Sequence, residues 1–214
     1  MKITIYSIKG SAGKTPIATN IALDFGYCIG TNEAINVYDM FDEDQILKVG
    51  QNEEFPLLTS DTDIVFDLSG SISDSSLSIT SAIKQSDIVL VPIYNHIRSL
   101  QGGIQTILEV QQFTKNIIVV ATKLTKSRSK EKKRRGDYDW KKSEDYINIA
   151  NQIRENIDYD VPILPLKFSN GFDVVDDEEK SIIQLVESNN LYKHYYGLEA
   201  KQLKHIYKLI KNYD

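Results

Sequence analysis

Six short apolar runs, spaced along the whole chain, constrain the fold more than any other feature. They cover residues 3–8, 34–38, 64–68, 88–92, 117–121 and 161–164. Strands that are buried on both faces of a parallel sheet have continuous Val, Ile and Leu runs of this kind. Longer stretches with helical spacing separate the runs, which favours repeated β-α-β units. We therefore expect an α/β fold with three layers, in which helices cover both faces of a mainly parallel, twisted sheet.

Helices are expected between these runs, where start signals and periodicity coincide. Pro16 suits the first turn of one helix, and Ser73 or Asp74 can cap another. Near the C-terminus, apolar side chains at spacings of three and four predict an amphipathic helix. Its apolar positions are Leu203, Ile206, Tyr207 and Ile210. We expect this helix to pack on the sheet rather than to lie on a membrane.

Length and composition favour one domain over residues 1–214. A chain of 214 residues with 41% hydrophobic content can bury one good core. The single Cys28 can form no internal disulfide and no CxxC metal site. The three histidines lack the spacing of metal ligands. No apolar run is long enough for a secretory signal or a membrane span, so a soluble, cytoplasmic protein is expected.

The net charge of −5 hides a strongly basic segment at about residues 123–142, which holds ten Lys or Arg against three acids. A solvated loop is the default interpretation of such a block. Its charge density also suits sequence-independent DNA binding. Trp140, inside the segment, is expected to anchor in the core rather than stack on bases. The candidate DNA-binding residues are Arg128, Lys130, Lys132, Lys133, Arg134 and Arg135.

Residues 10–15, GSAGKT, lie between the first apolar run and the first expected helix. Glycines there let backbone N–H groups converge on phosphates, and the helix N-terminus adds its positive dipole. In such a loop Lys14 reaches the β and γ phosphates, and the Thr15 hydroxyl binds Mg²⁺. The placement predicts a nucleotide site. Its candidate residues are Lys9, Gly10, Ser11, Ala12, Gly13, Lys14, Thr15 and Pro16.

Three stretches resemble the ParA/MinD family of dimerising ATPases. KGSAGKT, which starts at Lys9, resembles the deviant Walker A loop KGGxGK[ST] of that family. IVFDLSG, which contains Asp67, resembles its Walker B segment. SDIVLVPIYNHIRSLQGG, at residues 86–103, resembles its ADxVLIPVxPxxxSxxG segment, and a looser likeness in PILPLKFSNGFD extends towards the C-terminus. The chain is most similar to small ParA-type plasmid and chromosome partition proteins.

The resemblance implies ATP and Mg²⁺ as cofactors and assigns roles to several residues. Lys9 would cross a dimer interface to the partner's nucleotide and, with Lys14, assist hydrolysis. Asp67 and Thr15 would hold Mg²⁺. A loop containing Pro165 and Phe168 would lie against the adenine. A surface lysine and a helix-capping aspartate are the alternatives for Lys9 and Asp67.

Three departures from the family pattern concern activity. Ser11 replaces the second glycine, which is tolerable only if its φ stays negative. Pro16 has no N–H for the α-phosphate, so weakened ATP binding is expected. The family's DxDPQ is replaced by YDMFDEDQ, in which Asp39 matches the first acid and Phe41 occupies the second position. Asp42 is then the candidate to place the attacking water, with an acidic helix start as the alternative.

The expected function is that of a weak, partner-stimulated partition ATPase. It would dimerise on ATP, bind nucleoid DNA non-specifically and be reset by hydrolysis with a centromere-binding adaptor protein, as in plasmid segregation. Because the first strand begins at Lys2 or Ile3, no N-terminal DNA-reading domain is expected. One alternative is a MinD-like membrane-associated positioning ATPase, and another is a non-hydrolysing, nucleotide-dependent interaction module.

Overall fold

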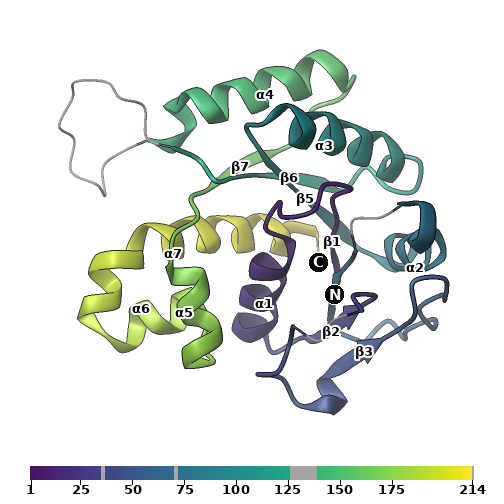
Figure 1. Cartoon of the computed structure of the whole chain (residues 1–214), viewed down its shortest axis with the longest axis horizontal. Coiled ribbons are helices and arrows are strands. Elements are labelled where there is room, and N and C mark those ends of the chain that lie inside the picture. The colour runs from purple at the N-terminus through teal and green to yellow at the C-terminus, as the bar shows by residue number, and fades with distance from the viewer. Residues whose placement is uncertain (35–36, 70–71, 126–138, 214) are drawn as a thin grey trace.

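The computed structural model describes residues 1–34, 37–69, 72–125 and 139–213 (Figure 1). Strands within these residues form a seven-stranded sheet in the order β3-β2-β4-β1-β5-β6-β7, and every neighbouring pair is parallel. The strands are β1 (Lys2–Ile5), β2 (Cys28–Thr31), β3 (Ile46–Lys48), β4 (Ile64–Asp67), β5 (Ile88–Tyr94), β6 (Ile117–Thr122) and β7 (Ile163–Leu166).

Helices alternate with the strands over most of the chain, and three of them follow one another after β7. The α-helices are α1 (Lys14–Phe25), α2 (Ile72–Gln85), α3 (Ile97–Val110), α4 (Glu144–Asn156), α5 (Gly171–Glu178), α6 (Ile182–Ser188) and α7 (Asn190–Ile210). Short 3₁₀ turns are η1 (Glu43–Gln45), η2 (Trp140–Lys142) and η3 (Lys211–Tyr213). Since α2 begins at Ile72, Ser73 and Asp74 lie in its first turn and not before it.

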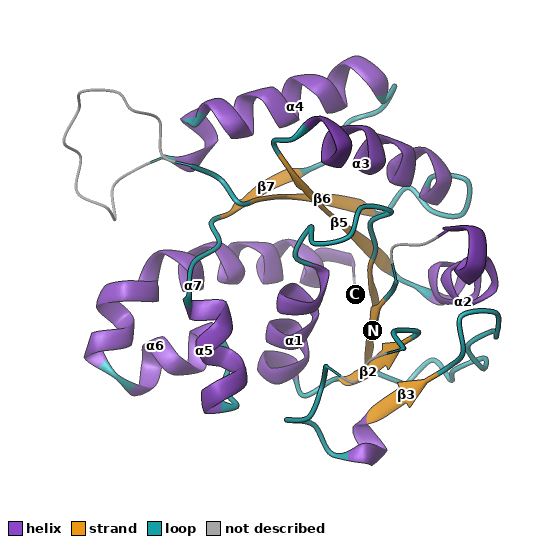
Figure 2. Ribbon diagram, viewed as in Figure 1, coloured by secondary structure: helices purple, strands orange, loops and turns teal. Residues whose placement is uncertain are grey.

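The helices cover both faces of the sheet, which confirms the expected three layers (Figures 1 and 2). Successive strand residues point to opposite faces, so Ile64 and Val65 enter different cores. Helices α1, α5, α6 and α7 pack on one face, and α2, α3 and α4 pack on the other. Trp140 is 6% exposed in the second core, so it is the core anchor that the sequence predicts.

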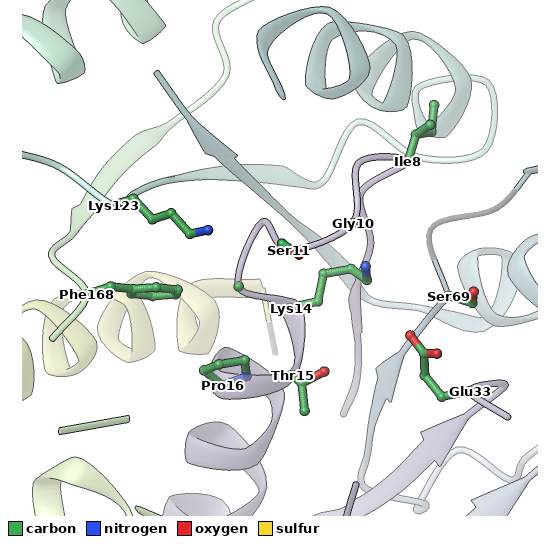
Figure 3. A pocket seen from close by; sticks show the side chains of 11 residues that line it. Ile8, Gly10, Ser11, Lys14, Thr15, Pro16, Glu33, Ser69, Lys123 and Phe168 are labelled. Atoms are coloured by element: carbon green, nitrogen blue, oxygen red, sulfur yellow. The ribbon is translucent and has the colours of Figure 1, made fainter. Parts of the chain in front are cut away.

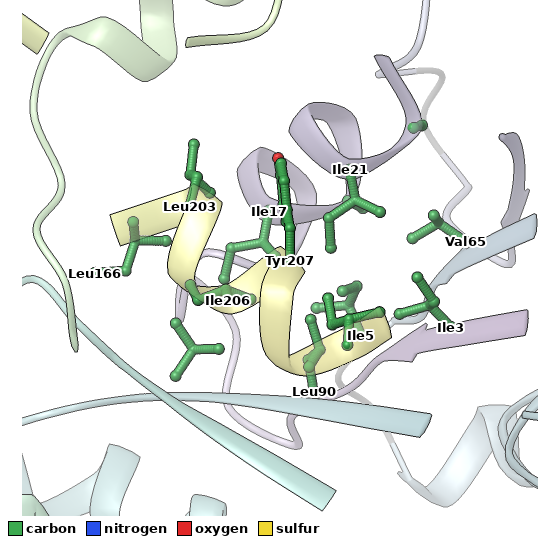
Figure 4. Close-up of a cluster of buried hydrophobic side chains, with 14 of the residues drawn as sticks. Ile3, Ile5, Ile17, Ile21, Val65, Leu90, Leu166, Leu203, Ile206 and Tyr207 are labelled. Atoms are coloured by element: carbon green, nitrogen blue, oxygen red, sulfur yellow. The ribbon is translucent and has the colours of Figure 1, made fainter. Parts of the chain in front are cut away.

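The last helix packs its apolar stripe into the core (Figure 4). Leu203 and Ile206 of α7 are fully buried with Ile5 and Leu90 of the sheet and Ile17 of α1. Each such side chain contributes about 1.5–3 kcal/mol by leaving water. The prediction that this stripe packs on the sheet is therefore confirmed. In the described residues no helix combines the length and apolar character needed to cross a bilayer.

The predicted strand at residues 34–38 is wrong where it can be compared, because Ala34, Val37 and Tyr38 lie in no strand; residues 35–36 lie outside the described residues. The second strand is β2, which ends at Thr31, and the edge strand β3 was not expected. Gly30 explains the error, because glycine is unfavourable in strands as a local preference. A Cβ at Gly30 would lie 2.4 Å from Cδ1 of Phe66, so packing against β4 requires a residue with no side chain there.

Strand β1 occupies the centre of the sheet, between β4 and β5. The chain passes from β1 through α1 to one side of the sheet and later returns to β5 on the other side. Ligands of open parallel sheets bind at such a reversal, outside the carboxyl ends of the strands. The loop that follows β1 lies at this position.

Candidate functional site

The loop between β1 and α1 has a backbone in which two residues are left-handed. Gly13, just before α1, has φ +98°, and a Cβ there would lie 2.2 Å from the Phe168 ring. Glycine is therefore required for both conformation and space. Ser11 has φ +60°, so the condition of a negative φ is not met. A residue with a Cβ in this region carries a strain of about 1–2 kcal/mol.

A cavity of about 650 Å³ opens over this loop (Figure 3). The residues that line it are Ile8, Gly10, Ser11, Gly13, Lys14, Thr15, Pro16, Glu33, Ser69, Lys123 and Phe168. Most of the predicted nucleotide-binding residues are thus brought together, including Phe168 from the loop after β7. A volume of this size is within the usual range for small-molecule sites.

Lys9, Ala12 and Pro165 do not line the cavity. Ala12 is fully buried, and its carbonyl accepts a hydrogen bond from the Thr122 hydroxyl at 3.0 Å. Lys9 is half-buried, with its backbone beside Gly102 of α3. Pro165 lies in β7 and borders a separate cavity of about 340 Å³.

The ammonium group of Lys14 is the clearest indication of what the site binds. It is the first residue of α1 and is only 7% exposed. Within the described part of the chain, no acidic side chain forms an ion pair with its ammonium group. The Asp67 carboxylate attracts this ammonium through space without such an ion pair. A buried charge without a direct counter-ion is costly, so the site favours an anion beside Lys14. The N–H groups at the start of α1 favour an anion as well.

Asp67, the last residue of β4, is fully buried beside Thr15. Its Oδ2 atom accepts hydrogen bonds from Thr15 Oγ1 at 2.7 Å and from the Tyr38 hydroxyl at 2.6 Å. Among the described residues, its Oδ1 atom has no hydrogen-bond partner. Burial raises the pKa of the Asp67 carboxyl, and the hydrogen bonds from Tyr38 and Thr15 offset part of that shift.

The same oxygens suit a magnesium ion. Mg²⁺ prefers oxygen ligands and is usually held by one or two protein groups, with phosphates and water completing its shell. The Thr15 hydroxyl and the unpartnered Oδ1 of Asp67 supply two such ligands. Burial and the neighbouring Asp67 raise the pKa of the Tyr38 phenol well above its usual value, so Tyr38 stays a hydrogen-bond donor to the carboxylate. The residues therefore fit the ion that the sequence predicts.

The structure does not bring Asp39 or Asp42 to the cavity. Asp39 is exposed and borders a different hollow with Asp176 and Glu179. Asp42 is exposed as well and caps η1, where its N–H donates to Gln45 Oε1 at 3.2 Å. Since β2 ends at Thr31, both aspartates are too far along the chain to follow the strand directly.

Glu33, rather than either aspartate, is the acidic residue that lines the cavity beside the loop. It follows β2 closely, and its N–H donates to Thr31 Oγ1 at 3.1 Å. The neighbouring Asn32 is buried and accepts a hydrogen bond from the N–H of Ser69 at 2.6 Å, which joins the ends of β2 and β4. Sequence reasoning missed Glu33 because it placed the second strand too late. Correct placement of β2 would have found it.

Lys123 and Ser69 are the other lining residues that sequence reasoning did not assign to this site. Ser69 lies two residues beyond Asp67, inside the stretch IVFDLSG, in which the family resemblance gives a role to Asp67 alone. Lys123 belongs to the basic segment in the sequence, but in the structure it directly follows β6 and lines the cavity. The proposed DNA contacts Arg128, Lys130, Lys132, Lys133, Arg134 and Arg135 lie outside the described residues.

Solved structures of three proteins are similar to this chain over almost its whole length. McdA from Cyanothece, in its ATP complex, has a TM-score of 0.63 and 13% identity, with 99% of this chain and 96% of that one covered. MinD, a cell division ATPase from Pyrococcus furiosus, has a TM-score of 0.64 and 12% identity, with 100% and 99% covered. A protein from Borrelia burgdorferi B31, described as a plasmid partition protein and bound to AMPPNP, has a TM-score of 0.54 and 13% identity, with 98% and 96% covered.

No protein-family model matches the sequence, and no curated protein is significantly similar to it. The parallel sheet and the glycine-containing loop at the start of α1 define the fold of a P-loop nucleoside triphosphatase. Within that class, the chain has the fold shared by McdA, the Borrelia plasmid partition protein and MinD. The resemblance to the ParA/MinD ATPases is thereby confirmed at the level of the fold.

Proposed function

We propose that this chain is a weak, dimerising partition ATPase of the ParA class. The observation that carries the proposal is the buried Lys14, which lines a cavity of nucleotide size together with Thr15, the hydrogen-bond partner of Asp67. A buried cation that makes no direct ion pair within the described residues favours a polyanion, and the adjacent oxygen ligands favour the divalent cation that accompanies a triphosphate. MgATP meets both requirements.

In the binding step, the loop N–H groups and Lys14 hold the phosphates. The positive end of α1 adds to their charge. Phe168, against Gly13, offers an apolar ring to the base. Pro16 lines the same cavity without an N–H to donate, so the α-phosphate loses one charge-assisted hydrogen bond.

In the hydrolytic step, the chain orients a water and stabilises negative charge on the γ-phosphate. We assign the orientation of that water to Glu33, because it lines the cavity and Asp39 and Asp42 do not. Thr15 and Asp67 would hold Mg²⁺, which neutralises charge that develops on the phosphates when it is bound. Lys14 contributes from the same subunit, and Lys9 of a second copy would contribute from across a dimer interface.

DNA binding would use the basic segment at about 123–142, with the six arginines and lysines named above as contacts. Its affinity would fall with salt, because phosphate contacts release counterions. A centromere-binding adaptor would stimulate hydrolysis and reset the dimer on the nucleoid. The membrane-associated alternative has less support, since the apolar stripe of α7 is buried in the core.

The deciding experiment measures retention of a DNA fragment with ATP, with ADP and without nucleotide, at ~50 and ~200 mM salt. We expect retention with ATP only, and weaker retention at the higher salt. Lys14→Ala is the matched control, since it should lose the response to ATP while its basic segment is intact. DNA binding that ignores nucleotide would overturn the partition proposal, and failure to bind ATP at all would overturn the ATPase proposal.

A further inference from the structure

We propose that a groove along α7 docks a partner protein through an acidic segment that also carries apolar side chains. The groove consists of two adjoining hollows of about 340 and 260 Å³, which share Leu198 and Lys201 as lining residues. The larger hollow lies between α7, β7 and η2, and the smaller one lies between α7 and Lys167. None of the lining residues lines the nucleotide cavity, so the inference goes beyond the proposed function.

One face of α7 forms a long side of the groove. Residues four positions apart lie on the same face of a helix. Four residues of α7 at this interval line the groove: Lys193, Gly197, Lys201 and His205. The chain that leaves β7, the last strand at its edge of the described sheet, passes beside this helix on its way to α5 (Figure 1). The groove therefore follows the helix where it meets the edge of the sheet.

Gly197 keeps the groove open in its middle. It lies inside α7, where glycine destabilises a helix relative to alanine. Its φ is not positive, and no described atom lies within 4 Å of the place that a Cβ would take. Neither the backbone nor the packing of the described residues thus requires glycine. Its effect is to leave space between Lys193 and Lys201, which any larger side chain would fill.

The groove has an apolar floor. Trp140 and Leu164 line the larger hollow and are 6% and 5% exposed, and the half-buried Leu198 continues into the smaller one. Tyr195, which is 49% exposed, lines the smaller hollow, and Leu191 is exposed one turn before it. Exposed apolar side chains that gather beside a hollow are typical of protein interfaces. DNA surfaces depend on phosphate contacts, so this floor favours a peptide over DNA.

The rim of the groove is basic. Three exposed lysines line it and form no ion pair within the described residues: Lys141, Lys193 and Lys201. Glu199 is fully buried, and its Oε1 atom accepts from the Lys167 ammonium at 2.6 Å, so these two charges neutralise each other. Asp139 is the other acidic lining residue. The remaining charge is positive, which complements an acidic partner.

Lys167 fixes the wall of the groove opposite α7. Its N–H donates to Gln202 Oε1 at 2.9 Å, and its ammonium donates to Glu199. Both its backbone and its side chain are thus held by α7. A wall that is already fixed lowers the entropic cost of binding, because little has to be ordered when the partner docks.

The first experiment identifies what the groove binds. A random dodecapeptide library displayed on phage is selected on the full chain without nucleotide. We expect the most enriched peptides to hold more Asp and Glu than Lys and Arg, together with apolar residues. Selection of no peptide, or of peptides without an acidic excess, would overturn the proposal.

The second experiment locates the most enriched peptide on the chain by fluorescence anisotropy. Gly197→Leu fills the groove and should weaken peptide binding at least ~tenfold. Lys201→Glu should weaken it roughly 5- to 30-fold, because it repels acidic side chains. Lys208→Glu, at an exposed lysine of α7 that lines neither hollow, is the matched control and should bind within about twofold. Unchanged binding in Gly197→Leu and Lys201→Glu would overturn the groove.

Thermal unfolding separates a blocked groove from a folding defect. Gly197→Leu should unfold at or above the wild-type temperature, since leucine favours a helix interior more than glycine does and the described residues leave open space there. Lys201→Glu, at an exposed position, tests the same groove without added volume.

A DNA duplex of about 20 base pairs serves as competitor. If the duplex displaces the peptide and Lys201→Glu removes its binding, the groove is a DNA surface and the proposal is overturned. No step of the test uses nucleotide. A chain that binds no ATP but selects acidic peptides would therefore lose the proposed function and keep this inference.

Discussion

At the scale of single residues, the phosphate loop carries two substitutions that act on different properties. Ser11 places a Cβ in a left-handed conformation and so affects the stability of the loop. Pro16 removes a backbone donor in the first turn of α1 and so affects the ligand. The fold accommodates both, because proline suits a first helical turn and the strain at Ser11 is small beside the stability of a domain.

Ser11→Gly should stabilise the protein. Glycine relieves about 1–2 kcal/mol of left-handed strain, and its greater freedom in the unfolded chain offsets part of this, which leaves a gain of about 0.5–1 kcal/mol. Urea unfolding measures the change. Lys201→Gly, at an exposed position in the middle of α7, is the control and should destabilise by a similar amount. A loss of stability in Ser11→Gly would show that φ +60° is not the source of strain.

Pro16→Thr should tighten nucleotide binding. The new N–H lies where the α-phosphate is expected and adds a charge-assisted hydrogen bond of roughly 1–3 kcal/mol, or about 5- to 150-fold in the dissociation constant. Titration with MgATP measures it. An unchanged dissociation constant would mean that water or a side chain already replaces the missing donor.

Glu33→Gln should reduce hydrolysis without loss of binding. The amide keeps the size of the side chain but cannot accept a proton from water, so the rate of ATP hydrolysis should fall at least ~tenfold. Phosphate release and the ATP dissociation constant are measured together. Asp42→Asn, at the cap of η1, is the contrasting variant and should hydrolyse ATP normally. The reverse result would return the role to Asp42.

At the scale of elements, hydrogen bonds from α1 to α6 and α7 fix the position of α1 and so of the phosphate loop before it. Asn20 is fully buried, and its amide donates to the Pro16 carbonyl at 2.8 Å and accepts from the N–H of Ile182 at 2.8 Å. One turn further, Asp24 accepts hydrogen bonds from the hydroxyls of Ser181 and Tyr207. Polar contacts thus set the position of a helix whose inner face is apolar.

Asn20→Ala should destabilise the domain by roughly 2–3 kcal/mol, because it removes two buried hydrogen bonds and leaves the Ile182 N–H without a partner. Chemical unfolding measures the loss. Asn148→Ala removes a hydrogen bond on the exposed side of α4 and should cost less than ~1 kcal/mol. Similar losses at the two positions would argue against a special role of α6 in holding α1.

At the scale of the whole molecule, the proposed cycle depends on two copies of the chain. Lys9 does not line the cavity of its own subunit, and its backbone lies beside Gly102 of α3. The exposed Ile97 begins the same helix. A face made by the loop and α3 would bring Lys9 to the nucleotide of a second copy, as the family resemblance implies.

Lys9→Ala should abolish ATP-dependent dimerisation and leave ATP binding by the monomer within about twofold, since the lysine acts on the other subunit's phosphates. Light scattering with ATP and with ADP measures the mass. Lys193→Ala, at an exposed lysine of α7, is the matched control. Dimers of Lys9→Ala with ATP would remove Lys9 from the interface.

The interior strands and the phosphate loop could be predicted from the sequence, whereas the edge of the sheet and the cavity-lining residues Glu33, Ser69 and Lys123 could not. Strands β4, β5 and β6 are apolar on both faces, so composition alone identifies them. Strand β2 contains Gly30 because the Phe66 ring fills the space that any side chain at position 30 would need. No local preference reveals that contact, so the sequence places the second strand too late and points to Asp39 and Asp42 instead of Glu33.

The sequence by itself determined the α/β class and the loop GSAGKT at the start of the first helix, because apolar runs, glycine spacing and helix-start signals are local features. The family resemblance added the expectation that Asp67 acts together with Thr15. Only the tertiary structure decided that Ser11 is left-handed and that Glu33, Lys123 and Phe168 share one cavity. Those three residues come from loops after different strands, and the order in which strands pair, not their order in the chain, brings them together.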